Sequence, residues 1–363
     1  MELGIGAFGD ANYDPATGTR ISEAQAIRNV VESIVVAEQA GLDWFGVGEH
    51  HTPEFPASSA APILAAAAAQ TTRIKLSSAV TVLGTDDPVR VYEQYSTVDA
   101  ISHGRVEMIP GRGSSVESFP LFGYDLQDYD RLFAEKLELL LEINRSARVT
   151  WSGTTRPALN GEYVPPRPEH GPIPIWLGVG GNPKSAIRAA ALGLPLATGV
   201  LGGNAVRSAP LADLYRRAAQ ELGNPPEQTL VMLGSPGFLA KDGRSARETW
   251  WPHWHQFMKV VGEQRGFLPP TRASYDRDTG PGGGLLIGSP EEIAERILHM
   301  HERWGHVRQY IHIDTGALPQ KEVLRAIELF GTEVRPLVQA ELGATTVDEL
   351  MGRRTVGAPR VDR

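Results

Sequence analysis

Short apolar runs alternate with longer helical stretches along most of this 363-residue chain, and this alternation constrains its fold most. Eight runs are predicted as strands, at 3–8, 43–48, 74–83, 105–109, 173–179, 194–200, 229–239 and 307–313. A predicted helix follows each one, at 24–40, 62–70, 89–101, 128–143, 183–192, 209–222, 290–304 and 321–337. Several strands are almost continuously apolar, as strands buried on both faces of a parallel sheet are. Eight such units predict an α/β fold, a single (β/α)8 TIM barrel.

Two segments interrupt the alternation and are interpreted as insertions after the fourth and seventh strands. Residues 145–172 are rich in Pro and Gly and predict an irregular hairpin, and 241–285 form a long excursion with a helix near 250–261. We expect one catalytic domain at 1–340 and a polar tail at 341–363 whose composition is compatible with disorder. A doubly wound sheet with a second domain is the alternative, but no interdomain linker is evident.

Composition excludes several classes of protein. The absence of cysteine excludes a disulfide scaffold, a thiolate nucleophile and a Cys-ligated metal site. No apolar run approaches the ~20 residues of a membrane span, and the N-terminus lacks the basic region of a signal peptide. A net charge of −8 without a Lys/Arg run argues against a nucleic-acid partner. We therefore expect a cytoplasmic protein with neither a membrane nor a nucleic-acid partner.

Three consecutive polar residues, Glu49, His50 and His51, follow the second predicted strand. Barrel enzymes place their chemistry at the carboxyl ends of the strands, so these residues are candidate site residues. Alternation along a strand would put Glu49 and His51 on one face and His50 on the other. A hydrogen-bonded structural histidine and a histidine-ligated metal are alternatives, and we predict no metal site. After the third strand, the small residues of 77–81 would let a flat group approach the backbone.

Two further strand ends carry features of an anion site. Arg112 stands between two glycines after the fourth strand, where its guanidinium could fork onto phosphate oxygens. After the fifth strand, a glycine-rich turn runs into a helix whose N-terminus adds a positive dipole. These strands are neighbours in a barrel, so both could grip one phosphate. The alternative for Arg112 is a surface arginine in a turn, and the glycine pattern is not Gly-x-Gly-x-x-Gly.

With these motifs, the chain resembles the luciferase-like flavin-dependent monooxygenases of the bacterial luciferase superfamily over about residues 1–335. The resemblance rests on four blocks in order, at 49–55, 73–123, 175–195 and 288–292. It implies that His50 is the catalytic histidine and that 241–285 is a mobile active-site loop. It also implies a non-proline cis peptide between Ala79 and Val80 beneath the flavin. The implied cofactor-binding residues are Ser78, Ala79, Val80, Arg112, Val179, Gly180, Gly181, Asn182 and Ser185. Where some members carry acidic and hydroxyl side chains, this chain has Gly181 and Asn182.

The implied function is a two-component monooxygenase that uses reduced FMN and O2 to oxidise a small organic substrate through a peroxyflavin. Because no nicotinamide fingerprint is present, a separate flavin reductase would supply the reduced FMN. Candidate substrate-binding residues are Glu49, His51, Trp250 and Trp254, although the tryptophans could equally belong to the core. An F420-dependent hydride-transfer oxidoreductase and a non-catalytic flavin-binding homologue are the alternatives. Most relatives are homodimers or higher homo-oligomers, and we expect the same here.

Overall fold

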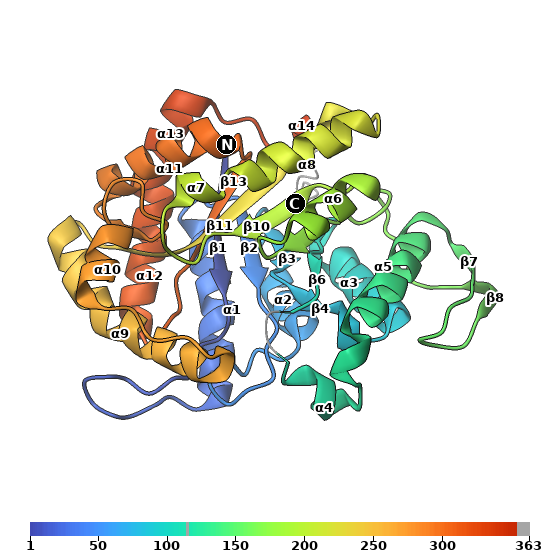
Figure 1. The fold of residues 1–363 in the computed structure, drawn as a ribbon, viewed down its shortest axis with the longest axis horizontal. Helices are drawn as coiled ribbons and strands as arrows, with labels where there is room; N and C mark the ends of the chain where they lie inside the picture. The colour runs from blue at the N-terminus through green and yellow to red at the C-terminus, as the bar shows by residue number, and fades with distance from the viewer. Residues whose placement is uncertain (114–115, 354–363) are drawn as a thin grey trace, which may run out of the picture.

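A curled sheet of eight parallel strands forms the centre of the computed structural model, which describes residues 1–113 and 116–353 (Figure 1). Within these residues the strand order is β5-β3-β2-β1-β13-β11-β10-β9. An isolated parallel bridge between Met108 and Ile175 joins the two ends of this order, which closes the sheet into a barrel. The strands are β1 (Glu2–Ala7), β2 (Trp44–Val47), β3 (Lys75–Ser78), β5 (Val106–Glu107), β9 (Leu177–Val179), β10 (Leu196–Gly199), β11 (Val231–Leu239) and β13 (Arg308–His312).

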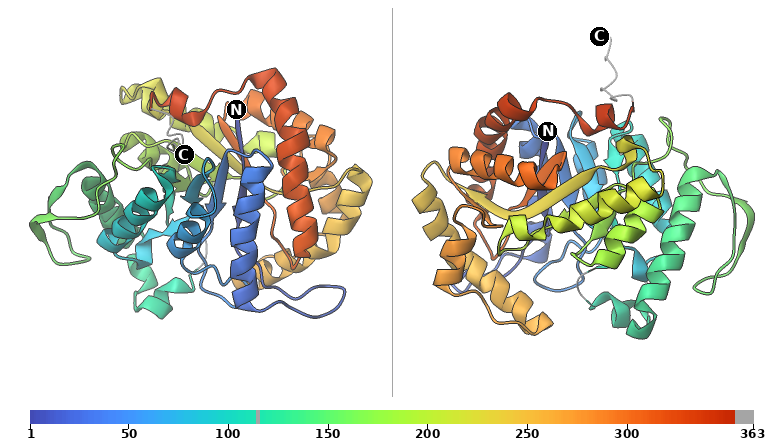
Figure 2. Two further views of the ribbon diagram at one scale, coloured as in Figure 1. Left: turned by 180° about the vertical axis from the view of Figure 1, so that it is seen from behind. Right: turned by 45° about the horizontal axis from the view of Figure 1, so that its top comes forward.

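Helices cover the outer face of this sheet, as the alternation predicts (Figure 2). Ser22 accepts a hydrogen bond from the Gln25 amide and caps the first helix, because the first-turn amides lack partners within the helix. Among the helices that the structure describes, none is both long and apolar enough to span a membrane. The outer helices are α1 (Glu23–Gln39), α2 (Ala60–Ala68), α3 (Pro88–Ser102), α5 (Tyr129–Arg145), α6 (Pro183–Ala191), α8 (Pro210–Glu221), α11 (Pro290–Trp304) and α12 (Gln320–Leu329).

Two predicted strands are broken near their carboxyl ends. The predicted strand at 74–83 divides into β3 and β4 (Thr81–Val82), separated by a cis peptide between Ala79 and Val80. A short β6 (Pro110–Gly111) follows β5 and pairs with β4 in parallel. The cis peptide is where the family resemblance implies it. The extra pair β4–β6 extends the barrel wall toward its carboxyl end.

The two insertions differ in structure. Residues 145–172 contain the antiparallel hairpin β7 (Arg148–Trp151) and β8 (Leu159–Tyr163), which projects from the side of the molecule (Figure 1). Residues 241–285 are largely helical, with α9 (Gly243–Arg265) and α10 (Arg272–Asp278). A strand that the sequence did not predict, β12 (Leu286–Gly288), pairs with the end of β11. Short elements elsewhere are η1 (Leu83–Thr85), α4 (Ser118–Phe122), η2 (Leu126–Asp128), α7 (Ala205–Ser208) and η3 (Pro226–Gln228).

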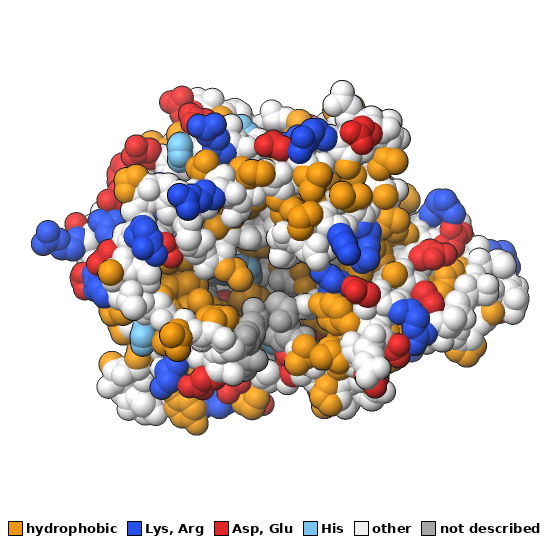
Figure 3. Space-filling view, viewed as in Figure 1, with side chains coloured by type: hydrophobic (Ala, Val, Ile, Leu, Met, Phe, Trp, Pro, Cys, Tyr) orange, Lys and Arg blue, Asp and Glu red, His pale blue; other side chains and the backbone are white. Residues whose placement is uncertain are grey.

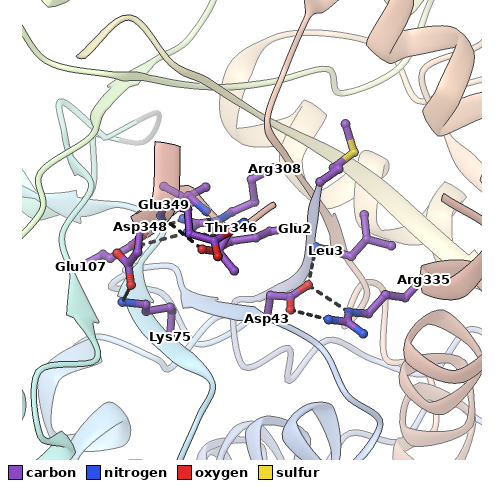
Figure 4. Close-up of polar contacts among 12 residues, drawn as sticks. Glu2, Leu3, Asp43, Lys75, Glu107, Arg308, Arg335, Thr346, Asp348 and Glu349 are labelled. Carbon is purple, nitrogen blue, oxygen red and sulfur yellow. Dashed lines mark hydrogen bonds and ion pairs between the residues drawn. The ribbon is translucent and has the colours of Figure 1, made fainter. Parts of the chain in front are cut away.

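The end of the chain packs against the amino-terminal mouth of the barrel, where the sequence left disorder open. After α12, the chain continues through η4 (Phe330–Val334), α13 (Arg335–Leu342) and α14 (Val347–Leu350). The Val347 amide donates to the Glu2 carboxylate at 2.8 Å. Asp348 pairs with Lys75 at 2.5 Å (Figure 4). These contacts and the buried Val347 side chain attach this part of the predicted tail to the barrel. The rest of the predicted tail, 354–363, lies outside the described residues.

Candidate active site

A cavity of about 650 Å³ opens at the carboxyl ends of the strands. Figure 3 shows a hollow on this face with hydrophobic side chains along its rim. Its volume lies within the range of about 300–1,000 Å³ that is usual for small-molecule sites. The residues that line it come from strand ends all around the barrel and from α9: they include Phe8, Glu49, His50, His51, Phe55, Ala79, Val80, Arg112, Glu117, Tyr129, Val179, Gly180, Thr198, Trp254, Phe257, Met258, Val261 and Tyr310.

Glu49, His50 and His51 all line the wall of the cavity. The structure pairs His51 Nε2 with Glu49 Oε1 at 3.0 Å, as the shared face predicts. The other Glu49 oxygen accepts from the Val82 amide at 3.0 Å, which ties this segment to β4. His50 was expected on the opposite face, but it lines the same cavity. The strand β2 ends at Val47, so strict alternation no longer applies beyond it.

His50 forms a second polar pair, with Glu117. His50 Nδ1 lies 3.2 Å from Glu117 Oε1, just before α4. Partial burial opposes ionisation of Glu117, but the His50 hydrogen bond, the backbone hydrogen bonds and the electrostatic attraction of His50 together outweigh it and lower the Glu117 pKa to about 2. A carboxylate on Nδ1 favours the tautomer protonated there, which leaves Nε2 as the acceptor. Glu117 was missed by the sequence analysis, since no local pattern connects a carboxylate 67 residues away with this histidine.

Behind His50, Phe8 packs between two histidines. The Phe8 ring lies 5.1 Å from the His50 ring, edge to face, and stacks on the His312 ring at 4.4 Å. Burial, followed by the proximity of His50, lowers the pKa of His312 to about 4. His312 is therefore neutral at neutral pH, and it supports Phe8 without adding positive charge.

Small residues form the floor of the cavity between β3 and β9. Val80, on the cis peptide, packs so closely on Gly178 that a Cβ at Gly178 would lie 2.9 Å from Val80 Cγ1. Ala79 and Val179 also line the cavity. Ser78, a predicted cofactor contact, instead lies buried behind the floor, where its hydroxyl accepts from the Ile109 amide at 3.0 Å. It supports the floor but does not face the cavity.

Residues that the sequence analysis predicts to bind an anion lie together at the edge of the cavity, between β6 and α6. Arg112 Nη2 lies 3.3 Å from the Ser185 hydroxyl, and Nη1 donates to the exposed Asp130 carboxylate at 2.9 Å. Gly181 has φ +81°, and a Cβ there would meet no atom within 4 Å. The Asn182 side chain caps α6 by accepting from the Lys184 amide, so it serves the helix. The site thus offers a guanidinium, a hydroxyl and an open glycine turn.

One face of α9 supplies an apolar wall opposite the floor. Trp254, Phe257, Met258 and Val261 line the cavity at helical spacing. Trp250 does not reach it: the ring is fully buried and stacks on the far side of Trp254, with centroids 4.8 Å apart. The predicted pair is thus divided, with Trp254 in the cavity and Trp250 in the core. Met258 and Val261 follow Trp254 at helical spacing, and this spacing could have predicted that they share its face. The sequence analysis did not use this pattern.

Comparison with known proteins assigns the chain to a family. The sequence profile of the luciferase-like monooxygenases matches residues 1–306. The chain belongs to the luciferase-like monooxygenase family. The protein y4vJ of Sinorhizobium fredii is 28% identical over 345 residues, which cover 90% of this chain and 95% of y4vJ. Membership confirms the resemblance inferred from the sequence and indicates an oxidoreductase of the monooxygenase type.

Solved structures of luciferase-like proteins share the fold at low identity. The monooxygenase RslO1 from Streptomyces bottropensis has a TM-score of 0.78 and 23% identity, over 93% of this chain and 99% of RslO1. The oxygenating constituent of 3,6-diketocamphane monooxygenase from Pseudomonas putida, solved with FMN, has a TM-score of 0.73 and 18% identity, over 93% of this chain and 98% of its own. A coenzyme F420 dependent tetrahydromethanopterin reductase from Methanopyrus kandleri has a TM-score of 0.67 and 18% identity, over 92% of this chain and 98% of its own. The fold alone therefore accommodates either cofactor.

Proposed function

We propose that the chain is a flavin-dependent monooxygenase that uses reduced FMN and O2 to oxidise a small organic substrate. The observation that carries this proposal is one continuous cavity with an anion site at its edge and the His50–Glu117 pair on its wall. The family to which the chain belongs supports the reaction type.

The cavity has the features that a phosphate-bearing flavin requires. Arg112 and Ser185 would hold the phosphate, beside the exposed Gly180 and Gly181, where no atom lies within 4 Å of a Cβ position. Asp130 now pairs with Arg112, but its carboxylate is 75% exposed, so exchanging it for a phosphate costs little. Ala79 and Val80 line the floor, over which a ring system would lie. When bound, reduced flavin supplies the electrons that activate O2.

The chain's own residues would orient and shelter the reaction. His50 would accept or donate a proton at Nε2, while Glu117 holds its other nitrogen. The α9 wall would keep water away from the reacting atoms. A separate reductase would supply the reduced flavin, and this partner and a homo-oligomeric state stay predictions.

An F420-dependent hydride transfer is the second candidate, because an F420-dependent enzyme shares the fold at a similar TM-score. Anaerobic titration of the purified protein with reduced FMN and with reduced F420, followed by exposure to O2, separates the two. Tight binding of reduced FMN, with O2 oxidising the bound flavin at a rate different from that of free reduced FMN, supports the monooxygenase. Selective binding of F420 without O2 consumption would transfer the protein to the hydride-transfer group. Binding of FMN without substrate oxidation in a substrate screen would favour a non-catalytic homologue.

A further inference from the structure

We propose that the cavity selects a neutral organic substrate whose apolar body packs against α9 and whose single polar group faces His50. This inference rests on the proposed function, which it deepens by naming the substrate class.

A continuous aromatic surface leads from His50 to α9. The His50 ring lies 5.3 Å from Phe55, Phe55 lies 5.8 Å from Phe257, and Phe257 stacks on Trp254 at 5.5 Å. Met258 and Val261 extend this surface along the helix. A molecule that reaches His50 along this route therefore exchanges water for apolar contact over most of its length.

Polar contacts on the two flanks of this face of α9 hold the wall in place. The buried His253 ring places Nδ1 2.7 Å from the Gly316 carbonyl oxygen, beyond β13. His255 Nδ1 lies 3.1 Å from the Pro270 carbonyl oxygen. These contacts orient the neighbouring Trp254 and Phe257 toward the cavity, so the apolar surface belongs to the folded helix.

The charges beside His50 disfavour an anionic substrate. Two carboxylates, Glu49 and Glu117, lie there, and the partners that the structure gives their side chains are imidazoles and a backbone amide. Arg112, the cation among the described residues that line the cavity, is already engaged beyond β6, at the phosphate end. A carboxylate, sulfonate or phosphate next to His50 would therefore meet like charge without a compensating cation. A neutral hydrogen-bonding group incurs no such cost.

The test compares three probes on the full-length chain by ligand-observed NMR titration, with and without FMN. Cyclohexyl methyl ketone is neutral and apolar, cyclohexanecarboxylate has the same ring with a negative charge, and glucose is neutral but polar. We expect the ketone to bind at least about tenfold more tightly than either other probe. Equal or tighter binding of the carboxylate or glucose, or no ketone binding up to its solubility, would overturn the proposal.

Variants of α9 locate the binding. Phe257→Ala should weaken ketone binding by about tenfold, because it removes much of the apolar contact. Lys259→Ala is the control, since Lys259 lies on the same helix, is exposed and does not line the cavity. An equal loss in both variants, or none in Phe257→Ala, contradicts the proposed wall. Circular dichroism verifies folding. Ketone binding needs neither flavin nor O2. The ketone titration therefore tests the substrate class even if the flavin titration contradicts the proposed function.

Discussion

At the residue scale, His50 and Glu117 carry the proposed chemistry. We expect His50→Ala to lower kcat by about 10²–10⁴-fold while FMN binding is retained, because the ring acts on protons and not on the phosphate. Glu117→Gln should lower kcat less, because the side-chain amide oxygen of Gln can still accept from His50 Nδ1, which lies 3.2 Å from Glu117 Oε1 in the structure. The rate of oxidation of a substrate found in the screen measures both, with His170→Ala, an exposed histidine, as the control. Normal turnover in His50→Ala would remove the catalytic assignment.

Arg112 allows a second prediction at this scale. Arg112→Ala should weaken FMN binding by about tenfold or more, because charge-assisted hydrogen bonds contribute about 1.5–3 kcal/mol. Riboflavin, which lacks the phosphate, should bind the variant and the parent protein equally. Arg131→Ala removes the same charge from an exposed arginine of α5 that pairs with Asp128. Fluorescence titrations with both flavins distinguish a phosphate contact from a general loss of the site.

At the scale of elements, two aspartates tie the loops that follow β1 and β13. Asp314 accepts from the amides of Phe8 and Gly9, and Asp10 accepts from those of Gly316 and Ala317. Burial raises the pKa of Asp10 from 3.8 to about 6, and burial together with Asp10 raises that of Asp314 from 3.8 to about 7. These loops support Phe8, and through it the position of His50.

The raised pKa values predict how stability changes with pH. Between about pH 4 and 7 the folded state keeps protons that the unfolded chain has lost, so stability from these groups falls as pH rises. Relative to Asp314→Asn, the parent protein should lose on the order of 1 kcal/mol more between pH 5 and pH 8. Urea unfolding at both values measures this, with the exposed Asp213→Asn as control. A parent protein that gains stability relative to Asp314→Asn would refute it.

At the scale of the whole molecule, Arg308 joins three strands across the amino-terminal end of the barrel. It pairs with Glu2 of β1 at 2.6 Å and with Glu107 of β5 at 2.6 Å, and all three side chains are buried (Figure 4). Arg308→Ala leaves two buried carboxylates without their cation, so we expect a loss of about 3–5 kcal/mol in urea unfolding. Arg335→Ala breaks the more exposed pair with Asp43 and should cost less, about 1 kcal/mol or below. Similar losses would show that burial of the network is unimportant.

The sequence by itself determined the order of strands and helices, because apolar periodicity and caps such as Ser22 are local. It also located the strand ends, and so placed His50 and Arg112 at the carboxyl mouth. The resemblance, not periodicity, located the Ala79–Val80 cis peptide, which the structure contains. Only the tertiary structure decided which side chains meet there.

Glu117 reaches His50 from 67 residues away, Trp254 faces the cavity while Trp250 does not, and Val347 closes the opposite mouth. Such contacts depend on how the closed barrel brings distant loops together. Local patterns of apolar and polar residues do not determine that geometry.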